Sequence, residues 1–292
     1  MLKSYKGGDA MKKIECEILA PVGRLDDLSQ IIDAGADAVY FGLKGFSSRP
    51  KDADLSVEEL CKARIITRDR QIKMYVAINA AIADKYLDEV FSQMRKLESI
   101  NIDAFILADY GIINFVTKMK FKTPIHVSTL TGVYNIETVD LLSKLGVSRI
   151  ILSSDLYIDE MLEIIYECPK LEYEIVADGG ICFNSNRQCV LPHVNTMENF
   201  TVLCQLDYIL VENDNDLFEA KRIGNCPAKI HRTLGIYLGM GIKSYKIEGR
   251  TNPLWYIIKR VKEMKESKTY YMQKIEEIPG YMHYIYRNAQ WL

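Results

Sequence analysis

The chain of 292 residues lacks a long uncharged hydrophobic run and an excess of charge of either sign, since 37 Lys and Arg residues balance 39 Asp and Glu residues. No uncharged apolar stretch reaches the roughly 18 residues that a transmembrane helix requires. The first 13 residues contain no apolar segment of a secretory signal. A near-neutral chain also lacks the global basic footprint of many nucleic-acid-binding proteins, although a local basic patch stays compatible with it. These absences predict a cytoplasmic protein without membrane insertion.

The short motifs of several enzyme classes are lacking as well. No G-x-G-x-x-G follows the first strand-like run, and there is no phosphate loop of the Walker type, no H-E-x-x-H and no G-x-S-x-G. These absences count against a dinucleotide-binding domain, a P-loop nucleotidase, a classical zinc peptidase and an α/β-hydrolase. Hydrophobic residues make up 48% of the chain, with 17 Gly and 8 Pro, which excludes collagen-like and disordered proteins.

Eight short apolar runs are present, and most are separated by amphipathic helical patterns. The runs cover residues 17–23, 37–42, 73–79, 103–109, 124–130, 148–154, 171–178 and 243–249. They are continuous rather than alternating, as expected for a parallel sheet that is covered on both faces. Eight βα units in about 250 residues predict a TIM-like (β/α)8 barrel. A doubly wound sheet is the alternative, but it seldom keeps this regularity over eight units.

The alternation of strand and helix patterns predicts a single barrel domain at residues 14–292. The residues before it, 1–13, are expected to form a flexible N-terminal tail. One long excursion, residues 179–242, interrupts the domain after the seventh strand and has weak periodicity. Loops of this size are uncommon and usually functional. An excursion in this position lies at the C-terminal face of the barrel, where barrel active sites are built.

Four of the seven cysteines lie in this excursion, in the pattern Cys182-x6-Cys189-x14-Cys204-x21-Cys226. An odd cysteine count without a secretory signal argues against a disulfide framework. Four thiolates can bind an iron–sulfur cluster or a tetrahedral zinc ion. The wide spacing favours the cluster over zinc, and four unrelated buried cysteines are the third interpretation. The other cysteines, Cys16, Cys61 and Cys168, are expected to pack in the core.

Polar residues at the predicted strand ends are candidates for the active site. Those selected as catalytic or substrate-binding are His126, Asp178, Glu248 and Arg250. Each has a structural alternative. His126 lies inside an apolar strand and suits a barrel-lining role, and Asp178, like Asp109, suits a cap of the following segment. Glu248 and Arg250 suit either an ion pair at the barrel rim or an arginine clamp for a carboxylate or phosphate.

The chain resembles the U32 peptidase family, the collagenase-like group. The segments that carry the resemblance are residues 17–42, FSSR at 46–49, 102–111, 124–129, 145–156 and SYKIEGR at 244–250, together with the four-cysteine excursion. The resemblance implies a TIM-like barrel. It also implies a [4Fe-4S] cluster on Cys182, Cys189, Cys204 and Cys226, because family members that assist oxygen-independent hydroxylation hold one on four cysteines in this order.

The resemblance implies oxygen-independent hydroxylation of a quinone precursor or an RNA base as the leading hypothesis. The substrate is then a small molecule or RNA, and a paralogous U32 chain is the expected partner. A metal-dependent peptidase of the collagenase-like type is the first alternative. The second is a non-catalytic scaffold with a structural zinc ion.

Overall fold

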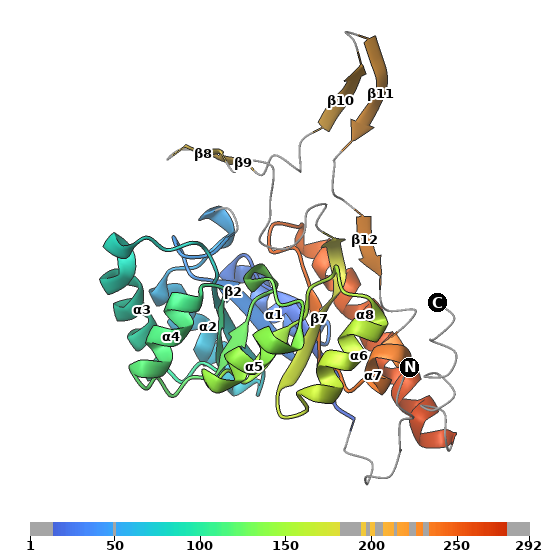
Figure 1. Ribbon diagram of the computed structural model, residues 1–292, viewed down its shortest axis with the longest axis horizontal. Coiled ribbons are helices and arrows are strands. Elements are labelled where there is room, and N and C mark those ends of the chain that lie inside the picture. Colours follow the sequence, from blue (N-terminus) through green and yellow to red (C-terminus); the bar gives the residue numbers. More distant parts are fainter. Residues whose placement is uncertain are drawn as a thin grey trace.

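Eight parallel strands form a closed barrel in the computed structural model (Figure 1), which describes residues 14–48, 51–181, 194–196, 199–201, 207–212, 215–221, 226–229 and 234–278. The barrel strands are β1 (Glu17–Pro21), β2 (Ala38–Gly42), β3 (Lys73–Ile78), β4 (Ala104–Leu107), β5 (Ile125–Val127), β6 (Arg149–Ile151), β7 (Glu172–Ile181) and β13 (Ser244–Ile247). They are hydrogen-bonded in the order β7-β13-β1-β2-β3-β4-β5-β6, and a pairing of β6 with β7 closes the ring. The predicted TIM-like barrel is therefore confirmed.

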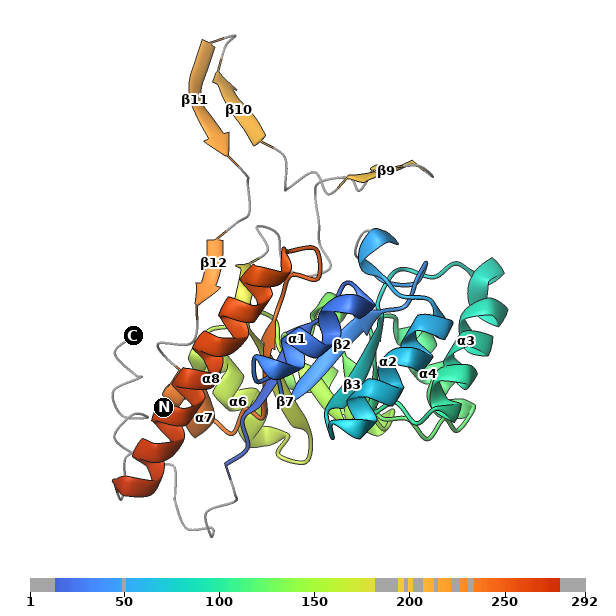
Figure 2. The same ribbon diagram turned by 180° about the vertical axis from the view of Figure 1, so that it is seen from behind.

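Helices surround the barrel in the alternation that the sequence predicts, with the exception of α7, which lies within the excursion and was not predicted. They are α1 (Leu28–Asp33), α2 (Val57–Asp69), α3 (Leu87–Ser99), α4 (Tyr110–Lys118), α5 (Ile136–Lys144), α6 (Ile158–Glu167), α7 (Leu234–Gly239) and α8 (Leu254–Glu277), with short 3-10 turns η1 (Leu25–Asp27), η2 (Lys51–Ala53), η3 (Asp84–Tyr86) and η4 (Thr129–Thr131). Figure 2 shows α8 crossing the outside of the barrel beside α1. Within the described residues, no helix combines the length and the apolar character needed to cross a bilayer.

Side chains at the helix starts explain where several helices begin. The Asp109 carboxylate accepts hydrogen bonds from the backbone N–H groups of Gly111 and Ile112 at the start of α4. Asp109 therefore caps α4, which is the structural role that the sequence suggested for it. Ser56 and Glu59 form a reciprocal capping box at the start of α2. This box fixes the end of the segment that connects β2 to α2.

The core has two layers. One lies between strands and helices, and the other fills the barrel with Leu19, Tyr40, Ala77, Ile106 and neighbouring side chains. Every position of β1, β2 and β4 is buried. Burial on both faces is the physical reason for the continuous apolar runs. The cysteines predicted to pack do so: Cys16 is buried in the core, and Cys61 and Cys168 pack against it.

An ionic network occupies the N-terminal end of the barrel interior. The guanidinium of Arg149 is 3% exposed and lies 2.7 Å from Glu17 Oε1 and 3.1 Å from Glu174 Oε2. Lys73 Nζ and the Tyr75 hydroxyl donate to the other oxygen of Glu17, at 2.8 and 2.9 Å. Polar groups at this end of a barrel serve stability rather than catalysis.

The excursion contains more regular structure than its weak periodicity indicates. Strand β7 continues three residues past the predicted end at 178, and β12 (Cys226–Lys229) pairs with it in antiparallel register. Two hairpins precede β12, formed by β8 (Val194–Thr196) with β9 (Asn199–Thr201) and by β10 (Asp207–Glu212) with β11 (Asn215–Lys221). Figures 1 and 2 show the β10–β11 hairpin projecting away from the barrel. Strands of this kind pair within or beside the excursion and are not separated by amphipathic helical patterns, so they do not stand out as βα units in the sequence.

Candidate active site

A buried cluster around Arg250 joins an N-terminal and a C-terminal segment of the chain at the C-terminal face of the barrel. Arg250 follows β13, whereas Ser47 and Asp54 belong to the connection between β2 and α2. The Arg250 guanidinium donates from Nη1 to Asp54 Oδ1 at 2.7 Å and from Nη2 to Ser47 Oγ at 2.8 Å. Ser47 Oγ in turn donates to Asp54 Oδ1 at 2.8 Å. The guanidinium that was expected to pair with Glu248 or to bind an anion is thus bound by Asp54 and Ser47.

Two glycines make room for this cluster. A Cβ atom at Gly42 would overlap the Arg250 guanidinium and the Asp54 carboxylate, and one at Gly23 would overlap the backbone carbonyl of Arg250. Gly42 ends β2 and Gly23 lies two residues after β1, so a larger residue at either position would displace Arg250. The absence of a side chain at these two positions leaves the space that Arg250 occupies.

The Asp54 carboxyl has an unusual ionisation. Its side chain is 1% exposed. Burial raises its pKa to about 6, while the charge of Arg250 and the hydrogen bonds from Ser47 and Arg250 oppose that rise. A carboxyl that titrates near neutral pH beside a charged guanidinium is a feature of functional sites.

The Tyr40 ring, inside the barrel, lies near two cations. Lys246 Nζ is 4.3 Å from the centroid of the Tyr40 ring, and Arg250 Cζ is 5.8 Å from the same centroid. The Tyr40 hydroxyl donates to the carbonyl of Ile247 at 3.2 Å. Lys246 is buried despite its charge. Tyr40 and Lys246, like Asp54 and Ser47, were not selected from the sequence, although Lys246 and Ser47 stand in the SYKIEGR and FSSR segments.

Asp178 and Glu248 lie next to each other on neighbouring strands. The backbone N–H of Glu248 donates to the carbonyl of Asp178 at 2.7 Å. The Asp178 carboxylate is 5% exposed, and its Oδ1 lies 3.4 Å from Nε of Arg260 on α8. Because β7 continues past it, Asp178 is a strand residue and the prediction of a cap at this position is wrong. Its ion pair instead holds α8 against the end of β7.

His126 lies inside the barrel, with its ring 4.7 Å from that of Tyr75 in an edge-to-face arrangement. Burial, followed by the nearby charges of Arg149, Lys73 and Lys246, lowers the pKa of His126 well below its ordinary value. The imidazole is therefore neutral at neutral pH. Its Nδ1 is buried without a hydrogen-bond partner. These surroundings agree with the barrel-lining role that the sequence left open for His126.

The four clustered cysteines fall largely outside the described part of the chain. Cys182, Cys189 and Cys204 lie outside the described residues, and only the backbone of Cys226 is described. Cys226 is paired with Ile181 in the β12–β7 ladder, and Cys182 follows Ile181 directly in the sequence. Within the described ranges, no group of His, Cys, Asp and Glu side chains is arranged to hold a metal ion. The predicted ligand set thus stays a prediction.

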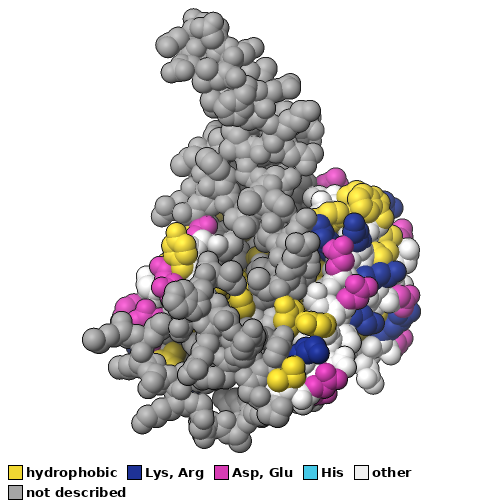
Figure 3. All heavy atoms as spheres, turned by 90° about the vertical axis from the view of Figure 1, so that its right-hand side faces the viewer, with side chains coloured by type: hydrophobic (Ala, Val, Ile, Leu, Met, Phe, Trp, Pro, Cys, Tyr) yellow, Lys and Arg dark blue, Asp and Glu magenta, His cyan; other side chains and the backbone are white. Residues whose placement is uncertain are grey.

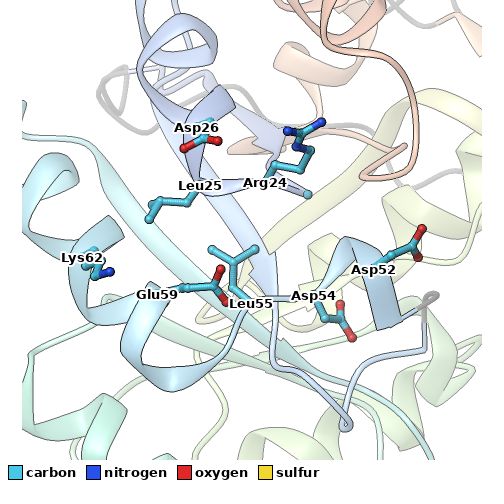
Figure 4. A pocket seen from close by; sticks show the side chains of 9 residues that line it. Arg24, Leu25, Asp26, Asp52, Asp54, Leu55, Glu59 and Lys62 are labelled. Atoms are coloured by element: carbon cyan, nitrogen blue, oxygen red, sulfur yellow. The ribbon is translucent and has the colours of Figure 1, made fainter.

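A polar pocket of about 260 Å³ lies beside the Arg250 cluster (Figure 4). It is formed by the turn after β1, the segment before α2 and the first turns of α2. Its lining residues are Gly23, Arg24, Leu25, Asp26, Asp52, Asp54, Leu55, Glu59 and Lys62. The Glu59 carboxylate already accepts a hydrogen bond from the Ser56 backbone. Asp54 connects this pocket to Arg250.

The described surface carries mixed charge. On the face shown in Figure 3, basic, acidic and hydrophobic side chains of the described residues are interspersed. This distribution agrees with the balance of 37 basic and 39 acidic residues. The coloured part of that face presents no broad basic surface.

Comparisons with known proteins relate this geometry to a family. Residues 23–287 match the family described as "Peptidase family U32". The tRNA hydroxylation protein P of Helicobacter pylori is 28% identical over 267 residues, which cover 83% of this chain and 62% of the relative. A protein named collagenase from Porphyromonas gingivalis is 26% identical over 262 residues, covering 82% of this chain and 62% of the relative.

An RNA-modifying relative and a solved structure extend the comparison. The 23S rRNA 5-hydroxycytidine synthase of Escherichia coli is 24% identical over 269 residues, covering 90% of this chain and 39% of the relative. The chain thus spans less than two thirds of the length of these three relatives. A glycerophosphodiester phosphodiesterase from Parabacteroides distasonis matches with a TM-score of 0.52 at 8% identity, over 90% of this chain and 99% of that one. This last likeness concerns the barrel fold alone.

Proposed function

Because the chain belongs to peptidase family U32, we propose that it takes part in oxygen-independent hydroxylation of an RNA base and holds an iron–sulfur cluster for this purpose. The observation that carries the proposal is the similarity to two relatives whose names state RNA hydroxylation, one acting on tRNA and one on 23S rRNA. A quinone precursor is the other substrate of this chemistry that the sequence left open.

The proposed ligands of a [4Fe-4S] cluster are Cys182, Cys189, Cys204 and Cys226. The backbone supports the choice of the first and the last. Cys226 is paired with Ile181, and paired antiparallel Cα atoms lie about 5 Å apart. Cys182 follows Ile181 directly in the sequence, so the first and the last of the four cysteines both adjoin the β7–β12 pairing. When bound, such a cluster supplies one-electron redox chemistry at thiolate-ligated iron.

The described residues supply the binding part of the mechanism. Arg250 is held by Asp54 and Ser47 at the C-terminal ends of the strands. Because both of its Nη groups are engaged and its side chain is 3% exposed, we assign Arg250 to shaping the mouth of the barrel around the substrate. Lys246 adds positive charge deeper in the barrel. Glu248 and Asp178 border the same mouth and are assigned to orienting the substrate. His126 is neutral and is assigned to the barrel lining between these groups and the ionic network.

Anaerobic purification with iron and sulfide analysis and a visible spectrum tests the cluster. We expect about four irons per chain. The cluster should be lost in Cys189→Ser and in Cys226→Ser. Cys168→Ser is the matched control, since that thiol packs against the core outside the excursion. Zinc in place of iron, or iron that survives both variants, would refute the cluster assignment.

The substrate is tested by mass spectrometry of nucleosides from tRNA and rRNA. The RNA comes from cells that lack the protein and from the same cells complemented with the wild type or with Cys226→Ser. A hydroxylated nucleoside that returns only with the wild type supports the proposal. Unchanged RNA with an altered quinone pool would move the assignment to the quinone precursor. Co-purification of a second U32 chain from the same cells tests the predicted paralogous partner.

A metal-dependent peptidase is the second candidate, because one relative is named a collagenase and the family is described as a peptidase family. This candidate predicts cleavage of denatured collagen or another peptide substrate that stops when a chelator is added. A scaffold with structural zinc predicts stoichiometric zinc, no visible absorption and no turnover. Metal content, visible absorption and peptide cleavage, measured on the same preparations, test both alternatives.

A further inference from the structure

We propose that Tyr86 and Trp255 are stacking contacts for unpaired bases of a single-stranded RNA segment that crosses the mouth of the barrel. The proposal rests on the proposed function and deepens it, because it names the kind of RNA that is recognised and the side chains that hold it. The two rings bind the strand on either side of the site and take no part in the chemistry.

Tyr86 and Trp255 are exposed aromatic residues at the C-terminal face of the barrel. Tyr86 ends the turn η3 between β3 and α3, and Trp255 lies in the first turn of α8, which follows β13. Their exposed fractions are 43% and 66%. Strands β1 and β2 lie between β13 and β3 in the ring. The two rings therefore stand on either side of the pocket in Figure 4, which is formed by the segments that follow β1 and β2.

The separation of the two rings favours an extended ligand. Three strand spacings lie between β13 and β3, and neighbouring strands are about 4.8 Å apart, so the two positions are roughly 14 Å apart along the sheet. Rings at this distance do not form the contiguous apolar patch that marks a protein interface. A single-stranded nucleic acid suits them, because each of its bases presents a face on which an aromatic side chain stacks.

A lysine accompanies each ring. Lys85 Nζ lies 4.8 Å from the centroid of the Tyr86 ring. Lys259 stands one helical turn after Trp255, on the same side of α8, and its side chain is 62% exposed. Its ion pair with Glu263 spans 4.0 Å at the surface, and pairs of this kind are weak. Both ammonium groups are thus placed for the phosphates that link stacked bases.

Both rings are carried by anchored segments. The backbone N–H of Ala80 donates to the carbonyl of Phe46 at 3.1 Å, which ties the segment before η3 to the connection after β2. The first turns of α8 are held by the ion pair between Arg260 and Asp178. Figure 2 shows α8 beginning at the end of the barrel from which the hairpins project. Tyrosine and tryptophan have only two side-chain torsions, so ordering these rings on binding costs little entropy.

Two other exposed tyrosines lack this combination of place and charge. Tyr157, at the start of α6, is 76% exposed at the same face of the barrel. Residues 150–169 around it include five acidic residues and no lysine or arginine, and negative charge repels phosphates. Tyr166 is 64% exposed near the other end of α6. Neither tyrosine is expected to contact the RNA, so both serve as matched controls.

Fluorescence anisotropy with the full chain tests the proposal, using an unstructured RNA oligonucleotide and a duplex of the same sequence. We expect the single strand to bind more tightly than the duplex. Tyr86→Ala and Trp255→Ala should each weaken binding of the single strand about tenfold, as the loss of one base–aromatic stack does. Tyr86→Phe and Trp255→Phe keep a ring and should restore most of the affinity. Tyr157→Ala and Tyr166→Ala should bind like the wild type.

Trp255 also gives a direct spectroscopic signal. The chain has two tryptophans, Trp255 and Trp291, so the tryptophan emission of a Trp291→Phe protein comes from Trp255 alone. A base stacked on the indole quenches that emission, and we expect quenching on titration with the single strand. Adding Tyr86→Ala should raise the concentration needed without changing the quenching at saturation. A merely structural role of Trp255 would produce no such quenching, and circular dichroism checks that each variant is folded.

Several results would overturn the inference: unchanged affinity in both alanine variants, equal losses in Tyr157→Ala and Tyr166→Ala, no quenching of Trp255, or no binding of single-stranded RNA by the wild type. Loss of a co-purifying U32 chain with RNA binding intact would assign the rings to a protein contact instead. Hydroxylated RNA formed at the wild-type level by the Tyr86→Ala, Trp255→Ala double variant would overturn the inference and leave the proposed function. RNA binding through both rings in a protein that hydroxylates no RNA would refute the proposed function alone.

Discussion

Glu17 shows how one buried carboxylate sets the acid stability of the barrel. Burial alone would raise its pKa, but Arg149 and Lys73 lower it to about 2. Because the folded-state pKa lies below that of the unfolded chain, the stabilisation is complete above about pH 4.5 and is lost as pH falls toward 2. The shift corresponds to about 3 kcal/mol at neutral pH. We expect Glu17→Gln to lose about this much unfolding free energy at pH 7 and to show a smaller further loss between pH 5 and pH 2.5.

Glu15→Gln is the control for that prediction, measured by urea unfolding at each pH. Glu15 lies two positions away and pairs with Lys243 at 3.5 Å, but its side chain is 56% exposed. An exposed ion pair contributes at most about 1 kcal/mol. If both variants lose the same stability with the same dependence on pH, Arg149 does not hold Glu17 as described. The importance of Arg149, like that of Asp54, was not predicted from the sequence, because both depend on partners far away in the chain.

At the scale of elements, the start of α2 links helix stability to the candidate site. The Ser56 hydroxyl accepts from the Glu59 backbone at 3.3 Å, and the Glu59 carboxylate accepts from the Ser56 backbone at 2.8 Å. Ser56 stands two positions after Asp54. We expect Ser56→Ala to cost about 1 kcal/mol of stability, as measured by urea unfolding. Glu59→Gln should cost much less, because glutamine also completes a capping box.

Ser267→Ala provides the control, since Ser267 lies within α8 and its hydroxyl donates to the carbonyl of Glu263. Such bonds to the preceding turn contribute little to helix stability, so this variant should match the wild type. An equal loss in Ser56→Ala and Ser267→Ala would contradict the capping argument. The helices and barrel strands were predictable because burial on one or two faces imposes a periodicity. The strands of the excursion, β8 to β12, were not, because they pair as hairpins or with β7 and lack the helices that mark βα units.

At the scale of the whole molecule, the barrel and the excursion differ in how far local sequence patterns predict their structure. The barrel could be predicted from eight apolar runs: seven of them contain a whole strand, and the run at 171–178 contains all of β7 except its last three residues. The candidate site was predicted only in outline. Arg250 stands at the predicted end of the last strand, but its partners Asp54 and Ser47 come from the connection after β2, two strands away in the ring. The pairing of β13 with β1, and of β1 with β2, brings together residues 196 positions apart, so no local pattern reveals these partners.

Deleting the β10–β11 hairpin tests whether the excursion contributes to the stability of the barrel. Its strands pair with each other and project away from the barrel in both views (Figures 1 and 2). Replacing residues 207–221 with a short Gly-Ser linker keeps all four clustered cysteines in the chain. Because little apolar surface of the barrel is exposed by this change, we expect the midpoint of thermal unfolding to move by no more than a few degrees, equivalent to about 1 kcal/mol. The matched variant Ile106→Ala, within the barrel interior, should lower the midpoint much more, because a buried Ile→Ala change typically costs about 2–5 kcal/mol. A hairpin deletion as damaging as Ile106→Ala would mean that the excursion is part of the folding core rather than an addition to it.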